Sequence, residues 1–152
     1  MSTSDQPEAF VSVEQRPAGV GVRFLARLID GIVAGITAYI LLQIVGLGDD
    51  LVIFASVGIL IVFSYFVILE STWGSTVGKK IFGLRVFDSS GGKPSMGSAA
   101  LRNIFLAISA VPFVGPVIDF ILRIVIAVTI SQSSTKQGIH DRWAKTQVRR
   151  VS

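Results

Sequence analysis

Two pairs of oppositely charged residues lie in or beside the apolar stretches of this sequence. Arg27 and Asp30 are three residues apart at the edge of the first stretch, and Asp119 and Arg123 are four residues apart within the last. Residues at these spacings share one face of a helix and can form ion pairs. An ionised side chain deep in hydrocarbon costs at least ~2.5–3.5 kcal/mol. Asp119 and Arg123 are therefore our best candidates for chemistry within a membrane, and each pair has a purely structural role as its alternative.

Other kinds of chemistry have little support in the sequence. There is no cysteine and one histidine, His140, so we expect no disulfide, no thiolate nucleophile and no metal site. His140 precedes Asp141, and we interpret the histidine as bonded to its neighbours at the membrane surface. The spacing of serine, histidine and acidic residues supports no nucleophilic mechanism. We expect no catalytic residue, no enzyme activity and no cofactor.

Two long uncharged stretches predict membrane-spanning helices. Residues 31–48 are 18 positions without a charge and residues 51–69 are 19, close to the ~20 residues that cross a ~30 Å hydrocarbon core. We place the helices at about 24–47 and 51–70, joined by a tight hairpin. The mean hydropathy of +0.66 agrees with a membrane protein.

The last apolar region, residues 103–130, is too long and too interrupted for one straight helix. It contains Pro112, Gly115 and Pro116 in addition to the charged pair. One interpretation is two shorter helices, at about 99–114 and 116–131, with a bend around residues 111–116. The other is one long, tilted and kinked helix followed by an external tail.

The distribution of basic residues favours the two shorter helices, because positive residues near helix ends are retained in the cytoplasm. Three arginines lie at 16–27, five basic residues lie at 79–102 and five more lie at 136–150, whereas the loop between the first two helices has only acids. An even number of crossings then places three segments in the cytoplasm. These are the N-terminal tail 1–20, which we expect to be flexible, the central loop 71–98 and the C-terminal segment 132–152.

Two segments outside the apolar stretches have the composition of short strands. They are residues 83–87, which a turn-forming segment follows at 88–92, and residues 146–151. We expect them to pair as a small two-stranded ribbon in the cytoplasm. The predicted fold class is an all-α membrane protein, a polytopic helical bundle with this ribbon in its cytoplasmic loop region.

Small and basic residues suggest two kinds of contact. Gly31 and Gly35 form a Gly-x-x-x-Gly pattern that lets a second helix approach closely, and a helix of the same chain is the simpler partner than a second copy. Residues 74–80 lack the spacing and the final serine or threonine of a phosphate-binding loop, so we expect no nucleotide. Lys79 and Lys80 are expected to contact anionic lipid headgroups instead.

Three segments resemble the RDD family of bacterial membrane proteins, which is named for one arginine and two aspartates. They are GVRFLARLID at 21–30, GSTVGKKIFGLRV at 74–86 and GIHDRWAKT at 138–146, and they occur in the order that the family shows. The resemblance implies a multi-pass protein of the bacterial plasma (inner) membrane. It also implies that Arg27, Asp30 and Asp141 are the residues of the family name. Some members of this family are associated with cation/proton exchange.

Two functions therefore remain open from the sequence. The first is movement of a small cation or proton, with Arg27, Asp30, Asp119, Arg123 and Asp141 as candidate relay residues or structural ion pairs. The second is a noncatalytic accessory or scaffold that packs against membrane lipid, other membrane proteins or a second copy of itself. The basic residues lie beside apolar stretches rather than in a separate basic domain, so we expect no nucleic acid partner.

Overall fold

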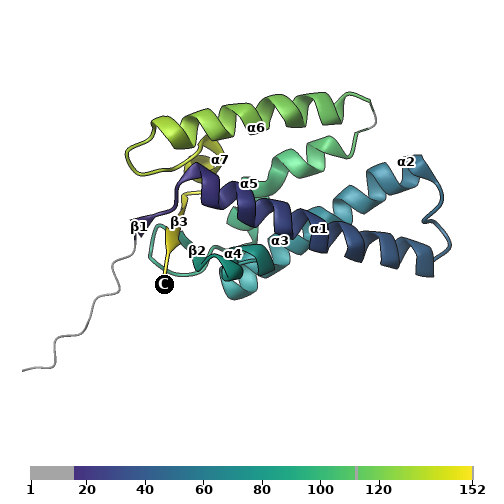
Figure 1. Cartoon of the computed structure of the whole chain (residues 1–152), viewed down its shortest axis with the longest axis horizontal. Coiled ribbons are helices and arrows are strands. Elements are labelled where there is room, and N and C mark those ends of the chain that lie inside the picture. Colours follow the sequence, from purple (N-terminus) through teal and green to yellow (C-terminus); the bar gives the residue numbers. More distant parts are fainter. Residues whose placement is uncertain (1–15, 112, 152) are drawn as a thin grey trace, which may run out of the picture.

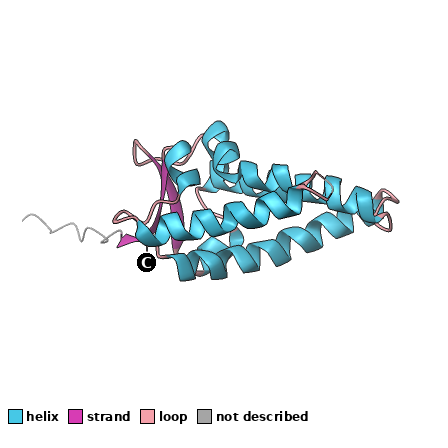
Figure 2. Ribbon diagram, turned by 90° about the horizontal axis from the view of Figure 1, so that it is seen from above, coloured by secondary structure: helices cyan, strands magenta, loops and turns pink. Residues whose placement is uncertain are grey.

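The computed structural model describes residues 16–111 and 113–151 as a bundle of lengthwise helices with a small sheet at one end (Figures 1 and 2). Residues 1–15 of the predicted N-terminal tail and Pro112 of the predicted bend lie outside this part. Three of the described helices are long and apolar enough to cross a membrane: Val20–Ile44, Leu51–Trp73 and Gly115–Gln132.

The first two long helices form an antiparallel hairpin. Helix α1 spans Val20–Ile44, and Gly46 then adopts a positive φ of 74° that turns the chain. Asp50 caps the return helix by accepting the N–H groups of Val52 and Ile53, each at 2.9 Å. That return helix is continuous over 23 residues and comprises α2 (Leu51–Ile53), a π-helical segment η1 (Phe54–Gly58) and α3 (Ile59–Trp73).

The last apolar region forms two helices rather than one. Helix α5 spans Met96–Ser109 and helix α6 spans Gly115–Gln132. They pack on each other, and the backbone is so tight at their junction that a Cβ on Gly115 would lie 2.4 Å from the carbonyl oxygen of Ile108. The 14-residue α5 does not reach the length of a membrane-spanning helix. The four observed helices start or end a few residues from the predicted bounds.

A three-stranded antiparallel sheet closes one end of the bundle. Its order is β1 (Arg16–Pro17), β3 (Thr146–Arg150) and β2 (Leu84–Asp88), with Val86 opposite Val148. The predicted ribbon corresponds to β2 and β3. Strand β1 was not predicted, because a two-residue strand at a proline has no recognisable pattern. Its pairing with β3 corrects the expectation that residues 16–17 belong to a flexible tail.

The sheet brings the two ends of the described chain together. Arg16 pairs with Arg150, so the start of α1 and the C-terminal strand lie at the same end of the bundle (Figure 1). Two short helices accompany the sheet, α4 (Val77–Ile81) and α7 (Ile139–Trp143). Beneath it lies a buried apolar cluster formed by Ala18, Ala26, Leu84, Val86 and Val148.

The closest helix contact uses Gly78 rather than the expected glycine pair. A Cβ on Gly78 of α4 would lie 2.2 Å from the carbonyl oxygen of Ala26 on α1. At Gly31 or Gly35 such a Cβ would have no atom of the described structure within 4 Å other than the adjacent residues and nearby backbone of α1 itself. The prediction that these two glycines pack against a helix of the same chain is therefore wrong. The small residues that α1 buries, Ala26, Ala34 and Ala38, lie on a different face.

Substitution by alanine should change the stability in opposite directions at Gly78, which is tightly packed, and at Gly35, which is open. We expect Gly78→Ala to lower the free energy of unfolding in detergent by about 3 kcal/mol, since the new methyl group meets a backbone oxygen. Gly35→Ala should raise it by about 0.5–1 kcal/mol, since alanine favours the helix and finds open space. Thermal and denaturant unfolding measure both. Equal effects of the two variants would contradict the packing described here.

Candidate functional site

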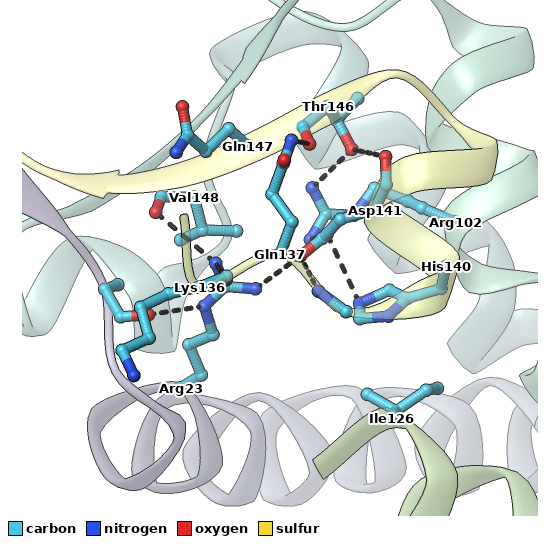
Figure 3. A network of polar contacts seen from close by, with 12 residues as sticks. Arg23, Arg102, Ile126, Lys136, Gln137, His140, Asp141, Thr146, Gln147 and Val148 are labelled. Carbon is cyan, nitrogen blue, oxygen red and sulfur yellow. Dashed lines mark hydrogen bonds and ion pairs between the residues drawn. The ribbon is translucent and has the colours of Figure 1, made fainter. Parts of the chain in front are cut away.

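A buried carboxylate at the sheet end, Asp141, is bound by two arginines from different helices (Figure 3). Arg23 of α1 donates from Nη1 to Oδ2 of Asp141 at 2.5 Å, and Nη2 of Arg102 on α5 lies 3.0 Å from Oδ1. Asp141 lies in the first turn of α7, where its carboxylate also accepts the N–H of Gly138 at 3.3 Å. Arg23 further donates to the carbonyl oxygens of Ala18 and Lys136.

A second buried carboxylate, Glu70, lies near the end of α3. It is fully buried, and Lys79 of α4 donates to its Oε1. Its other oxygen, Oε2, lies 3.2 Å from Nε of Arg102 and accepts from Nδ2 of Asn103 at 3.1 Å. Glu70 therefore has two cationic side chains and one amide group as its partners.

Arg102 joins the two carboxylates into one ion network. Its guanidinium contacts Glu70 on one side and Asp141 on the other, and its Nη1 donates to Oγ1 of Thr146 on β3 at 3.3 Å. The network connects five helices through a chain of contacts that runs Arg23, Asp141, Arg102, Glu70, Lys79. Every side chain in it is at most 10% exposed.

Arg27 and Asp30 do not pair with each other. Asp30 accepts three hydrogen bonds, from Oη of Tyr65 at 3.0 Å, Oγ1 of Thr76 at 2.5 Å and the N–H of Gly78 at 2.7 Å. These donors satisfy the carboxylate and fix α4 against α1. Arg27 extends the other way, toward α5, so the predicted pair is wrong even though the helical spacing allowed it.

Arg27 has no carboxylate within ion-pair distance in the described chain. Its Nη1 donates to Oδ1 of Asn103 at 3.0 Å, and its guanidinium carbon lies 3.6 Å from the ring centroid of Phe66. Nη2 is buried and has no hydrogen-bond partner among the described residues. A buried cation in this situation retains much of its cost of desolvation.

The two lysines of the central loop have different environments. Lys80 is exposed and its Nζ lies 3.9 Å from the ring centroid of Trp73, which suits an interfacial position. Lys79 is 6% exposed and bound to Glu70. The expectation that Lys79 contacts lipid headgroups is therefore wrong, because its ammonium group is the counter-ion of a buried acid.

The expected pair of Asp119 and Arg123 forms, away from the main network. Nε of Arg123 donates to Oδ2 of Asp119 at 2.6 Å along α6. The Arg123 side chain is 44% exposed, in contrast to the arginines of the network. Its guanidinium carbon lies 5.5 Å from the ring centroid of Phe105. The guanidinium carbon of Arg27 lies 5.2 Å from the same centroid.

A cavity of about 690 Å³ lies beside the network, between α1, α5 and α6. Most of its wall is apolar, and its polar part is cationic. No aspartate or glutamate of the described chain is among its lining residues. The basic side chains that line it are Arg23, Arg27, Lys79, Arg102 and Arg123.

The buried charges shift the pKa values of the groups in the connecting segments. Burial lowers the pKa of Lys79 to about 8, although Glu70 partly opposes this. Burial likewise lowers the pKa of His140 to about 4, and Arg102 and Arg23 add to the effect. For Asp141, burial acts to raise the pKa, but Arg102, His140 and Arg23 outweigh it and hold the pKa below its ordinary value.

The described residues contain no group of three or more histidine, aspartate and glutamate side chains that could hold a metal ion.

Comparison with known proteins identifies the family. The model of the RDD family matches residues 17–145. The chain belongs to the RDD family. It is 30% identical over 158 residues to the uncharacterized protein YxaI of Bacillus subtilis (strain 168), an alignment that covers 88% of this chain and 97% of the relative. The comparison with solved structures found no match. Together with the apolar helices, membership confirms the predicted family and the predicted fold class of an all-α membrane protein with a small sheet.

The family segments recognised in the sequence meet at the ion network and at the hydrogen bonds of Asp30. The first segment supplies Arg23 and Asp30, the second supplies Thr76, Gly78 and Lys79, and the third supplies Asp141. Glu70, Arg102 and Asn103 complete the site, and sequence reasoning missed them. Two local signals point to these residues: Glu70 directly follows an uncharged stretch, and Arg102 lies beside Asn103 in the following helix. Neither signal shows which residue the side chain contacts.

Removal of the carboxylate of Asp141 should destabilise the bundle. We expect Asp141→Asn to lower the free energy of unfolding by about 3 kcal/mol, because Arg23 and Arg102 lose a shared counter-ion in a buried position. Asp49→Asn is the control: Asp49 accepts one hydrogen bond from Gln43 at an exposed position, and its change should stay within about 0.5 kcal/mol. Unfolding in detergent that shows equal stability of both variants would contradict a structural network.

Acid should destabilise the protein through His140. Its pKa is lower in the folded state, so the unfolded chain takes up a proton first as the pH falls from about 6.5 toward 4. Stability should therefore fall by about 2 kcal/mol between pH 7 and pH 5. Asp141, whose folded pKa is also lowered, adds a loss below its ordinary pKa of 3.8. His140→Gln should flatten the profile between pH 7 and 5, and an unchanged slope in this variant would assign the loss to other groups.

Proposed function

We propose that this RDD protein is a noncatalytic membrane accessory or scaffold protein whose buried charges hold its helices in one arrangement. The observation that carries the proposal is that several side chains hold each of three buried carboxylates in place. Glu70 and Asp141 each contact at least two cationic side chains, and Asp30 accepts three hydrogen bonds. A carboxylate that carries ions must release its partners in each cycle, and release by Glu70 or Asp141 would leave buried cationic side chains without a counter-ion.

The cavity supports the same proposal. A small cation that moves through a protein needs oxygen ligands along its path. The polar lining of the cavity consists of arginines, a lysine, a histidine and an asparagine. This lining repels cations, so it disfavours passage of sodium, potassium or a hydrated proton at this place.

Cation/proton transport is the second candidate, and one observation favours it. The pKa of Lys79, lowered to about 8, lies near physiological pH, and the ammonium group is bound to Glu70. A buried group whose pKa lies near the ambient pH can release and take up a proton, and such groups are found at functional sites. Asp119 and Arg123 lie within a membrane-spanning helix and would be the intramembrane residues of such a relay.

The location we propose is the bacterial plasma membrane, with the sheet on the cytoplasmic side. Basic residues are concentrated in the segments at the sheet end, and both β1 and β3 lie there (Figure 2). On α1, Gly31 and Gly35 leave an open strip to which a helix of another membrane protein or a second copy could pack. This arrangement suits a protein that supports others in the bilayer.

Reconstitution of the full chain in proteoliposomes separates the two candidates. With a pH gradient and added sodium, lithium or potassium, a scaffold should give no flux above protein-free liposomes. Flux that Glu70→Gln abolishes and the exposed-site variant Asp49→Asn preserves would overturn the proposal in favour of transport.

Photocrosslinking of the same protein in native membranes tests the scaffold proposal directly. A photoreactive residue at Ile36, an exposed position beside Gly35, should give one discrete protein adduct, and Gly35→Leu should remove it. Ile121, equally exposed on α6, is the matched control position and should label lipid alone. Identical labelling at both positions would contradict a packing surface on α1.

A further inference from the structure

We propose that the cavity between α1, α5 and α6 binds an anionic phospholipid, whose phosphate is held by Arg27 with the help of Arg123. The site goes beyond the scaffold function proposed above and does not depend on it. In the bundle, α6 packs on α5 and meets α1 only sparsely, which leaves the cavity between them (Figure 1).

The positive charge of the side chains that line the cavity favours an anionic ligand. Arg23, Lys79 and Arg102 have carboxylate partners in the ion network, whereas Arg27 has none in the described chain. Nη2 of Arg27 is buried without a hydrogen-bond partner in the described chain, so the N–H groups of this nitrogen lack an acceptor that an oxygen ligand would supply. A phosphate satisfies a guanidinium in bidentate geometry and removes the cost of an unpaired buried charge.

Arg123 reaches the same place from the opposite wall. The guanidinium groups of Arg27 and Arg123 lie 5.2 and 5.5 Å from the ring centroid of Phe105, and both residues line the cavity. Asp119 neutralises part of the charge of Arg123 but bonds its Nε alone, and it does not line the cavity. The phosphate would therefore lie between two guanidinium groups, with Arg27 as the stronger contact.

The apolar wall identifies the rest of the ligand. Phe24, Leu28 and Ile32 of α1 face Phe120 and Ile124 of α6 across the cavity, and these side chains are 50–66% exposed. Both helices are long enough to span a membrane, so the part of this wall that is deeper than Arg27 lies in hydrocarbon. A free phosphate would leave this wall without a partner, whereas acyl chains cover it.

The depth of Arg27 agrees with a lipid of the leaflet on the sheet side. It lies seven residues after the start of α1 at Val20, about 10 Å along the helix. The headgroup layer and the edge of the hydrocarbon core occupy this range of depth, and arginine stems extend readily toward headgroups.

Lipid binding to the purified full chain tests the site. Native mass spectrometry and thermal unfolding in detergent would follow titration with dioleoyl phosphatidylglycerol, dioleoyl phosphatidylcholine and inorganic phosphate. We expect at least tenfold tighter binding of phosphatidylglycerol than of phosphatidylcholine. Equal affinity for the two lipids, or stabilisation by inorganic phosphate that the acyl chains do not increase, would overturn the proposal.

Four variants locate the binding. Arg27→Gln and Arg123→Gln should each reduce the preference for phosphatidylglycerol at least fivefold, and Ala127→Trp should weaken binding at least fivefold by filling the cavity. Arg85→Gln, an exposed arginine on β2, is the control and should bind as the wild type does. A loss in Arg85→Gln as large as in Arg123→Gln would mean general surface attraction. Arg123 is partly exposed, so its variant remains informative if Arg27→Gln fails to fold.

Discussion

The guanidinium group of Arg102 is the contact on which the rest of the structure depends. It bridges Glu70 of α3 and Asp141 of α7, and through them Lys79 and Arg23 hold α4 and α1. In hydrocarbon there is no hydrophobic force between helices, so polar contacts and close packing must supply their association. The network of buried charges at the sheet end supplies such polar contacts. This placement makes five helices and the sheet parts of one cooperative unit.

The helical framework could be predicted because it depends on local properties. Uncharged stretches of 18 and 19 residues predicted the first two long helices, and the prolines and glycines at 112–116 predicted the interruption between α5 and α6. The pairing of β2 with β3 followed from strand composition and the basic character of both segments. The strand at residues 16–17 was not predicted, because two residues are too few to show a strand pattern.

The ion network could not be predicted because its partners are far apart in the chain. Arg23 and Asp141 are separated by 118 positions, and Asp30 and Gly78 by 48. Local spacing suggested that Arg27 binds Asp30, but three donors from α3, the loop after it and α4 satisfy Asp30 first. Lys79 shows the same principle, since its sequence position suggests a surface residue while its partner is the buried Glu70. Tertiary partners, rather than helix periodicity, decide where a charge at the membrane edge points.

The central position of β3 has a consequence for how the protein is made. Neither β1 nor β2 has a strand partner until residues 146–150 are synthesised, and Arg23 of the first helix receives its counter-ion from residue 141. Helix α1 ends at Ile44, so it is complete almost a hundred residues before Asp141 supplies the counter-ion of Arg23. The sheet at this end of the bundle can therefore form only once the C-terminal segment has been made. Truncation before β3 would leave the helices without the strand that joins the two ends of the described chain.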